Sequence, residues 1–316
     1  MTRVPLIVPQ DPPVPNPAPS MTGRVCLITG ATSGIGAIVA RNLAARGATV
    51  VLVGRSEDRC RAVAESIRAE TGNAAVAWLC ADLSSLADIR RLAAEFRDRH
   101  QHLDVLINNA GAMFALRRES VDGIEMTLAL NHLSPFLLTT LLLDRMGPGG
   151  RIVTVSSDSH ELVRAFDFDD PQALRRGYGR SEAISFLRAV LTPRAHPGLV
   201  QYAHSKLANI LFTRELARRL EGTGITANAV HPGYINTGFT RANGAYGWFM
   251  RLWAGLFAKP PEAGAEPVTH LACASELAGV TGAYFAKGRE ARPSAAAQDD
   301  SAARRLWEFS ESLTRV

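Results

Sequence analysis

An apolar segment, a glycine-rich turn and a helical pattern follow one another between residues 24 and 46. The run Arg24–Ile28 has the short apolar character of a strand buried in a parallel sheet. Glycines in the next segment, Thr29–Gly36, let the backbone approach a pyrophosphate, and the following helix start offers unpaired N–H groups. The spacing Gly-x-x-x-Gly-x-Gly differs from the more usual Gly-x-Gly-x-x-Gly. Because a strand precedes this turn and a helix follows it, the turn predicts a dinucleotide-binding site formed by Gly30, Thr32, Ser33, Gly34, Ile35 and Gly36.

Strand and helix patterns alternate from Met21 onward, which predicts a single-domain α/β fold of the Rossmann type, with a doubly wound parallel sheet. We expect about seven strands with helices on both faces, at residues 24–29, 48–53, 75–80, 104–107, 151–156, 225–230 and 282–286. Ligands of such sheets bind beyond the carboxyl ends of the strands. Polar or glycine-containing segments follow several of these strands, so we expect them to meet at one edge.

The first twenty residues differ from the rest because they hold seven of the 17 prolines and no glycine. Proline excludes a regular helix there, so we expect a Pro-rich extended arm over 1–20 and one domain over 21–316. A signal peptide would need a positive segment followed by a long apolar one, and Val4–Val8 is too short to span a membrane. The sequence therefore predicts a soluble chain with no transmembrane segment.

The net charge of +5 and the pI of about 9.3 raise the question of a nucleic-acid partner. The arginines are, however, scattered over many helical patterns and mixed with acidic residues, which predicts a solvated surface and no nucleic-acid partner. The four cysteines show neither a close pair nor metal-ligand spacing. We expect reduced thiols, a cytoplasmic location and no metal site.

Tyr202 and Lys206 stand four residues apart in a helical pattern, which places both side chains on one helix face. A phenol ordinarily has a pKa of about 10. A nearby ammonium favours the phenolate, so the pair predicts a tyrosine that exchanges protons with a carbonyl or an alcohol. Only three of the 35 basic residues are lysines, which indicates that this position needs a compact ammonium.

These segments resemble the short-chain dehydrogenase/reductase family over roughly residues 22–313. Further motifs carry the resemblance: Asn108-Asn109-Ala110-Gly111, Asn131 before His132, Ser156-Ser157 at a strand end, and Pro232-Gly233-Tyr234-Ile235-Asn236-Thr237. The resemblance implies a catalytic tetrad of Asn131, Ser157, Tyr202 and Lys206. It implies coenzyme contacts at Asp82, Leu83, Asn109, Ala110, Gly111, Tyr202, Lys206, Pro232, Gly233, Ile235 and Thr237.

The family's mechanism assigns each tetrad member a role. Ser157 orients the carbonyl oxygen, and Tyr202 donates its proton as hydride arrives. Lys206 lowers the pKa of the tyrosine and holds the ribose hydroxyls, while Asn131 supports a relay water. Members are commonly dimers or tetramers, so the resemblance allows a homodimer or a homotetramer, and no residue in the sequence fixes the interface.

A branch of the family is also indicated. The segment His204–Phe212, the His-Pro-Gly turn and the tail Arg304–Glu308 look like the retinol dehydrogenase-like branch, which includes the WW-domain-containing oxidoreductase. This branch interconverts apolar carbonyls and alcohols, so the resemblance implies a small-molecule substrate of this kind.

The coenzyme preference depends on the residues after the second predicted strand, Gly54 and Arg55. An acidic side chain there would bind the ribose 2′-hydroxyl and repel a 2′-phosphate. Arg55 can bind a phosphate bidentately, so the sequence predicts NADP(H) over NAD(H).

Two segments are expected to determine substrate choice. An insertion over 158–200 separates Ser157 from Tyr202 and is expected to be a lid, a subunit contact or a tolerated surface loop. Residues 239–262 carry an aromatic stripe, Tyr246–Phe257, which we expect to form an apolar pocket wall or lid. Core packing and contact with a membrane surface are the alternatives for this stripe. Together these features predict a carbonyl reductase or alcohol dehydrogenase for a bulky apolar substrate. The alternatives are a C=C reducer similar to protochlorophyllide reductase and a dinucleotide-sensing scaffold protein without activity.

Overall fold

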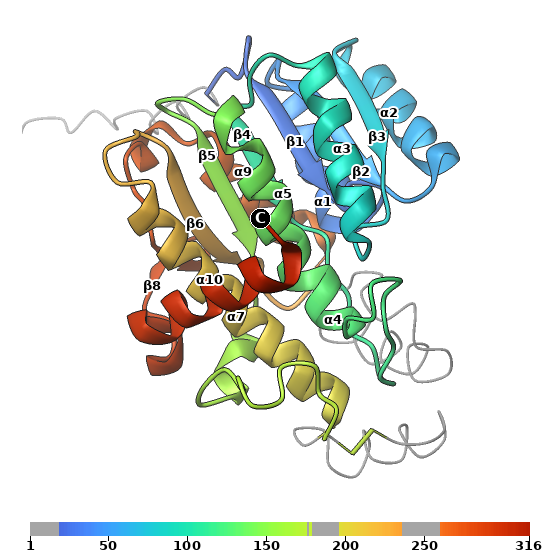
Figure 1. Ribbon diagram of the computed structural model, residues 1–316. Coiled ribbons are helices and arrows are strands. Elements are labelled where there is room, and N and C mark those ends of the chain that lie inside the picture. Colours follow the sequence, from blue (N-terminus) through green and yellow to red (C-terminus); the bar gives the residue numbers. More distant parts are fainter. Residues whose placement is uncertain (1–18, 176, 179–195, 236–259) are drawn as a thin grey trace, which may run out of the picture.

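The computed structural model describes residues 19–175, 177–178, 196–235 and 260–316, and the strands of this part form one sheet (Figure 1). Its strands are β1 (Val25–Thr29), β2 (Thr49–Gly54), β3 (Val76–Cys80), β4 (Val105–Asn108), β5 (Arg151–Val155), β6 (Thr226–His231), β7 (Tyr284–Ala286) and β8 (Arg289–Ala291). Their order is β3-β2-β1-β4-β5-β6-β7-β8. All neighbouring pairs are parallel except β7 and β8. The predicted α/β fold with a mainly parallel sheet is confirmed.

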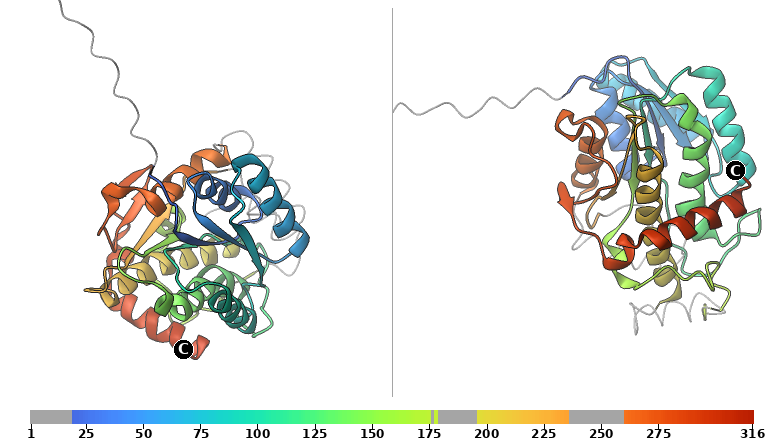
Figure 2. Two further views of the ribbon diagram at one scale, coloured as in Figure 1. Left: turned by 90° about the horizontal axis from the view of Figure 1, so that it is seen from above. Right: turned by 60° about the vertical axis from the view of Figure 1, so that its left-hand side comes forward.

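Helices cover both faces of the sheet (Figure 2). They are α1 (Gly34–Ala44), α2 (Glu57–Thr71), α3 (Leu86–Arg99), α4 (Met126–Leu128), α5 (Ser134–Leu142), α7 (Pro197–Arg219), α9 (Pro261–Cys273) and α10 (Asp300–Thr314). Buried side chains of α1, α2 and α9 share one apolar core with the sheet, and those of α3, α5 and α7 share another. The strands β1, β2, β4, β5 and β6 are therefore buried from both sides, which explains the continuous apolar runs in the sequence.

The functional edge of the sheet follows from the strand order. β1 lies between β2 and β4, and the chain leaves it through α1 on one face and returns to β4 through α3 on the other. The two connections therefore diverge at the carboxyl end of β1 and leave a crevice there. The glycine turn begins at this point.

The described residues contain eight strands, one more than the roughly seven that the sequence predicts. The additional strand, β8, pairs antiparallel to β7 through a two-residue turn, with Lys287 at φ 55° and Gly288 at φ 74°. Two successive positive φ values produce the type I′ turn that suits a tight hairpin. The residues of β8, Arg289, Glu290 and Ala291, form no apolar run, so periodicity gave no indication of this strand.

The C-terminal helix α10 packs across α5 and α7 (Figure 1). The ring of Trp307 lies 4.9 Å from that of Phe136 and 5.9 Å from that of Phe212, measured between centroids. The guanidinium of Arg219 lies 4.2 Å from the Trp307 ring centroid on the outer side. The end of the chain is thus part of the core on this face of the sheet.

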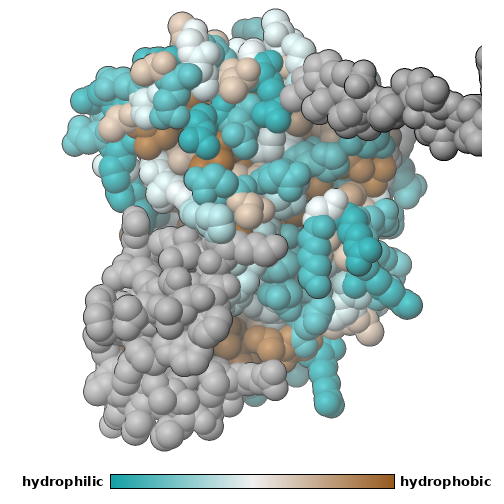
Figure 3. All heavy atoms as spheres, turned by 180° about the vertical axis from the view of Figure 1, so that it is seen from behind, coloured by the Kyte–Doolittle hydropathy of each residue, from teal (hydrophilic) through white to brown (hydrophobic). Residues whose placement is uncertain are grey.

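Figure 3 shows the molecule from behind relative to Figure 1, and most of the described surface on that side is hydrophilic. One described run, Met126–Arg145, is long and apolar enough to cross a membrane, and 72% of its most apolar window is buried inside the molecule. The four cysteines are free thiols. The predicted arm over 1–20 falls largely outside the described residues, as do much of the insertion over 158–200 and of the lid region over 239–262.

Candidate active site

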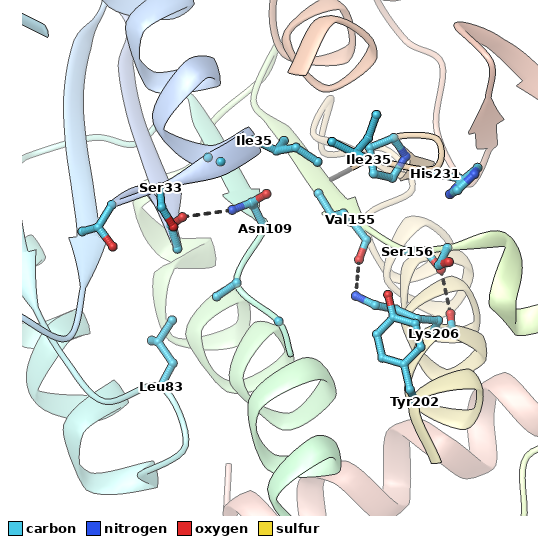
Figure 4. A pocket seen from close by; sticks show the side chains of 18 of the residues that line it. Ser33, Ile35, Leu83, Asn109, Val155, Ser156, Tyr202, Lys206, His231 and Ile235 are labelled. Atoms are coloured by element: carbon cyan, nitrogen blue, oxygen red, sulfur yellow. Dashed lines mark hydrogen bonds between the residues drawn. The ribbon is translucent and has the colours of Figure 1, made fainter. Parts of the chain in front are cut away.

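A cavity of about 460 Å³ lies at the carboxyl ends of β1, β2, β4, β5 and β6 (Figure 4). In Figure 4, Ser33, Asn109 and Leu83 lie on one side of the open space, and Ser156, Tyr202 and Lys206 lie on the other. Most of the predicted site residues line it: Gly30, Thr32, Ser33, Gly34, Ile35, Gly36, Arg55, Leu83, Asn109, Ala110, Gly111, Ser157, Tyr202, Lys206, Pro232, Gly233 and Ile235. Residues up to 205 positions apart in the sequence therefore share one cavity.

The glycine turn has a shape that only glycine permits. Gly30 has φ 66°, and a Cβ atom there would lie 2.9 Å from the Cα of Ala110. A Cβ atom at Gly36 would lie 2.5 Å from the carbonyl oxygen of Gly30. The N-cap residue of α1, Ser33, makes no side-chain capping bond, and the first turn of α1 contains no acidic residue. The backbone N–H groups of this helix start therefore suit an anionic ligand such as the pyrophosphate of a dinucleotide.

Thr29 holds the glycine turn against the segment after β4, a role that the sequence analysis missed. Its hydroxyl accepts hydrogen bonds from the backbone N–H groups of Asn109 (2.9 Å) and Ala110 (3.0 Å). The side-chain amide of Asn109 donates in turn to the carbonyl oxygen of Thr29 at 2.8 Å. A threonine at a buried strand end is common, so its spacing from Asn109 gave no signal.

The helix α7 carries Tyr202 and Lys206 into the cavity, and both are buried, with 9% and 3% of their surface exposed. The Nζ atom of Lys206 donates to the backbone carbonyl of Val155 at 2.9 Å and lies 5.5 Å from the Tyr202 ring centroid. The hydroxyl of Ser156 donates to the carbonyl oxygen of Lys206 at 2.8 Å. These two bonds fasten the helix to the end of β5.

Burial dominates the proton affinities of this pair. It raises the pKa of Tyr202 well above its ordinary value, a hydrogen bond from Ser157 opposes the rise, and the carboxylate of Asp158 adds to it. Burial also lowers the pKa of Lys206 to about 8. The sequence predicts a lowered pKa for Tyr202, and the structure differs because burial favours the neutral phenol over the phenolate. At neutral pH the phenol is protonated and can donate a proton.

Asn131 lies behind the catalytic pair in a π-helical turn, Ala129–Leu133, between α4 and α5. Its amide accepts from the N–H of Ala112 and donates to the carbonyl of Ala112, each at 2.9 Å. It also donates to the hydroxyl of Ser205 at 3.0 Å, and that hydroxyl donates to the carbonyl oxygen of Tyr202. Asn131 does not line the cavity itself, but it joins the segment after β4 to the helix of Tyr202.

Ser157 follows β5 and faces the cavity. Its hydroxyl lies 3.1 Å from the carboxylate of Asp158 and accepts from the N–H of Ser159 at 3.1 Å. It also hydrogen-bonds with Tyr202. The serine thus stands where a carbonyl oxygen could contact both hydroxyl groups.

Of the remaining predicted coenzyme contacts, Arg55 lines the cavity and Asp82 does not. Arg55 lines the end near β2, and Arg59, in the first turn of α2, lies beside it. The sequence analysis did not predict Arg59. Its position four residues after Arg55, at the start of a helical pattern, could have indicated it. Asp82 does not line the cavity, because its carboxylate accepts from the N–H and hydroxyl of Ser84. Thr237 lies outside the described residues.

The described residues contain no group of three or more His, Cys, Asp or Glu side chains that could hold a metal ion. The polar side chains that line the cavity carry hydroxyls, one amide, one ammonium, two guanidiniums, the imidazole of His231 and the carboxylate of Asp158. This donor set suits phosphate and ribose groups and the transfer of protons.

Comparisons with known proteins agree with this arrangement. The chain is 40% identical to human retinol dehydrogenase 13 over 301 residues, which cover 93% of this chain and 85% of the relative. It is 39% identical to human retinol dehydrogenase 12 over 298 residues, 94% of this chain and 88% of that protein.

Two solved structures are also similar. An uncharacterised protein from Mycobacterium paratuberculosis has a TM-score of 0.73 and 33% identity, covering 95% of this chain and 96% of that one. A short chain dehydrogenase from Burkholderia cenocepacia in complex with NADP has a TM-score of 0.64 and 28% identity, with 88% and 99% covered. The model of the short chain dehydrogenase family matches residues 24–165 and 183–246, and with these similarities it shows that the chain belongs to that family.

Proposed function

We propose that the protein is an NADP(H)-dependent oxidoreductase that interconverts a ketone or aldehyde and an alcohol on a bulky apolar substrate. The observation that carries this proposal is the meeting of Tyr202, Lys206 and Ser157 in the same cavity as the glycine turn. A protein that only senses a dinucleotide has no need of a buried, protonated phenol beside an ammonium and a serine hydroxyl.

The chain's own residues fit a dinucleotide. The backbone N–H groups at the start of α1 would bind its pyrophosphate. A side chain at residue 30 would collide with the backbone of Ala110, so the turn keeps this shape only with glycine at that position. The Lys206 ammonium would hold ribose hydroxyls. The bound coenzyme would supply or accept a hydride.

The proton chemistry follows from the burial of Tyr202. Because its pKa is raised, the phenol holds its proton at neutral pH and can act as the general acid when a carbonyl is reduced. The hydroxyls of Ser157 and Tyr202, hydrogen-bonded to each other, would both donate to the carbonyl oxygen. Asn131 keeps the helix of Tyr202 in register with the turn after β4 through Ser205.

NADP(H) is favoured over NAD(H) by the two arginines at the β2 end of the cavity. Both guanidiniums are exposed at its rim, and no acidic residue of the described chain lines the cavity near them. Glu57 and Asp58, which stand between them in sequence, do not line the cavity. Two guanidiniums suit a 2′-phosphate, which carries negative charge and several acceptor oxygens.

The apolar substrate is supported by the names of similar proteins, several of which are retinol dehydrogenases. Retinol is a bulky apolar alcohol. Within the segments that the sequence predicts to contact the substrate, 158–200 and 239–262, residues 176, 179–195 and 239–259 fall outside the described residues.

Fluorescence titration of the purified protein with NADPH and with NADH tests the coenzyme, and a panel of aromatic and polycyclic ketones then tests turnover. We expect tighter NADPH binding and oxidation of NADPH by at least one ketone. Tight binding without turnover on any carbonyl would favour the C=C reducer or the sensor protein. Equal efficiency with both coenzymes would contradict the NADP(H) preference.

A further inference from the structure

Both ring nitrogen atoms of His160 make hydrogen bonds, although this residue does not line the cavity. It lies in the short 3-10 helix Asp158–Leu162 directly after Ser157, and its side chain is completely buried. The Nδ1 atom lies 2.7 Å from the carbonyl oxygen of Ser157. The Nε2 atom lies 3.1 Å from the backbone nitrogen of Ser294, in the segment between β8 and α10.

The two partners fix the tautomer of the ring. A carbonyl oxygen can only accept, so Nδ1 carries the hydrogen, and a backbone N–H can only donate, so Nε2 is bare. The ring also packs edge-on against Tyr284 of β7, with centroids 5.2 Å apart. His160 therefore links three segments: the end of β5, β7 and the C-terminal segment.

The carbonyl of Ser157 is held twice by the same residue, since the backbone N–H of His160 also donates to it at 3.2 Å. The hydroxyl of Ser157 needs this support because it has competing partners. Asp158 and Ser159 each offer a polar atom at 3.1 Å, and Tyr202 is a further partner. Since the hydroxyl already lies 3.1 Å from the Asp158 carboxylate, a small rotation of the Ser157 backbone would weaken its bond to Tyr202 and leave the carboxylate and Ser159 as its partners.

We propose that His160 is a positioning residue. Because its ring bonds both to Ser294 in the C-terminal segment and to the carbonyl of Ser157, it holds the Ser157 hydroxyl in a fixed orientation. This proposal rests on the proposed function, because the Ser157 hydroxyl is taken to orient the carbonyl substrate. His160 itself contacts no substrate or coenzyme. Its effect is on the geometry in which Ser157 and Tyr202 meet the reacting oxygen.

The test compares two amide variants of the same residue. In His160→Asn the amide nitrogen can take the place of Nδ1 and keep the donor to Ser157, whereas in His160→Gln the amide oxygen can take the place of Nε2 and keep only the acceptor for Ser294. We expect kcat for ketone reduction to fall about tenfold or more in His160→Gln and no more than about threefold in His160→Asn. The Kd for NADPH should stay within about twofold in both.

A double-mutant cycle separates positioning from plain packing. When Ser157 is already changed to alanine, adding His160→Gln should lower the remaining kcat by less than about twofold, because no hydroxyl is left to position. The melting temperatures of all variants are measured alongside. Losses of kcat that are equal in the two amide variants, or that remain about tenfold in the Ser157→Ala background, would overturn the proposal.

The same variants distinguish this inference from the proposed function. A wild-type protein that oxidises NADPH with a ketone, together with a Ser157→Ala variant whose kcat is strongly lowered but still measurable, supports the function whatever His160 does. If Ser157→Ala keeps wild-type kcat, the proposed role of Ser157 fails. If Ser157→Ala strongly lowers kcat and both amide variants keep wild-type kcat, only the role of His160 fails.

Discussion

The side-chain ammonium of Lys206 donates a hydrogen bond to the backbone carbonyl of Val155, with Nζ and O 2.9 Å apart. The same carbonyl accepts from the amide of Asn209 at 3.2 Å. The lysine is therefore fixed at the strand end, with its Nζ atom 5.5 Å from the ring centroid of Tyr202. Buried in this way it has a pKa of about 8, so its charge is present below that pH and is lost above it.

Coenzyme binding should weaken as pH rises through 8, because the ammonium that we propose to hold the ribose hydroxyls is then deprotonated. Between pH 7.5 and 9.5 we expect the Kd for NADPH to rise roughly tenfold, the sign following from loss of the binding-competent protonated form. Fluorescence titrations across this range measure the effect. In Lys206→Met the Kd should be higher at pH 7.5 and nearly constant above it. A wild-type Kd that does not change would contradict this assignment.

Replacing Tyr202 by phenylalanine should remove turnover while keeping coenzyme binding. The change deletes one hydroxyl and leaves the ring on α7, so we expect kcat to fall by about 10³-fold, within the range for loss of a general acid. The Kd for NADPH should stay within about threefold of the wild-type value. Steady-state rates and fluorescence titration measure the two quantities. Retained turnover in this variant would refute the acid role.

The two arginines near β2 should determine coenzyme choice. We expect Arg55→Ala to raise the Kd for NADPH by about tenfold or more, since a charge-assisted bidentate bond is lost, and to leave the Kd for NADH within about twofold. Arg59→Ala should act in the same direction, and the double variant should bind both coenzymes similarly.

Arg61 provides the matched control for these variants. It lies in α2 like Arg59, forms an ion pair with Glu57 at 3.0 Å and does not line the cavity. Arg61→Ala should change neither Kd. Equal losses of NADPH and NADH affinity in Arg55→Ala would indicate a general electrostatic effect instead of contact with a 2′-phosphate.

Trp307 should be important for stability and not for catalysis. It is 6% exposed and packs on Phe136 and Phe212, so truncation to alanine should lower the free energy of unfolding by about 3–5 kcal/mol. Urea unfolding measures this loss. Phe309→Ala, on the half-buried side of the same helix, should have a clearly smaller effect. Comparable losses in the two variants would show that α10 is not held mainly by Trp307.

The sequence by itself determined the fold class, the approximate limits of seven parallel strands and most of the cavity residues. The strands, the glycine turn and the pair Tyr202 and Lys206 follow from local patterns: apolar runs of strand length, glycines at a turn and a four-residue spacing on one helix face. Ser157 and the coenzyme contacts after β3, β4 and β6 followed from the resemblance to a family. The strand β8 had no such pattern, since its pairing depends on the backbone of the turn at Lys287 and Gly288.

Only the tertiary structure decided which groups surround each site residue. Burial raised the pKa of Tyr202 although a lysine stands four residues away, because the energy of a charge depends on its whole surroundings and not on one neighbour. Arg59 joins Arg55 at the cavity, while Ser84 binds the carboxylate of Asp82. Ser294 reaches Ser157 through His160 across 137 positions of chain. Contacts of this kind arise from how the layers pack, which no short segment of the sequence encodes.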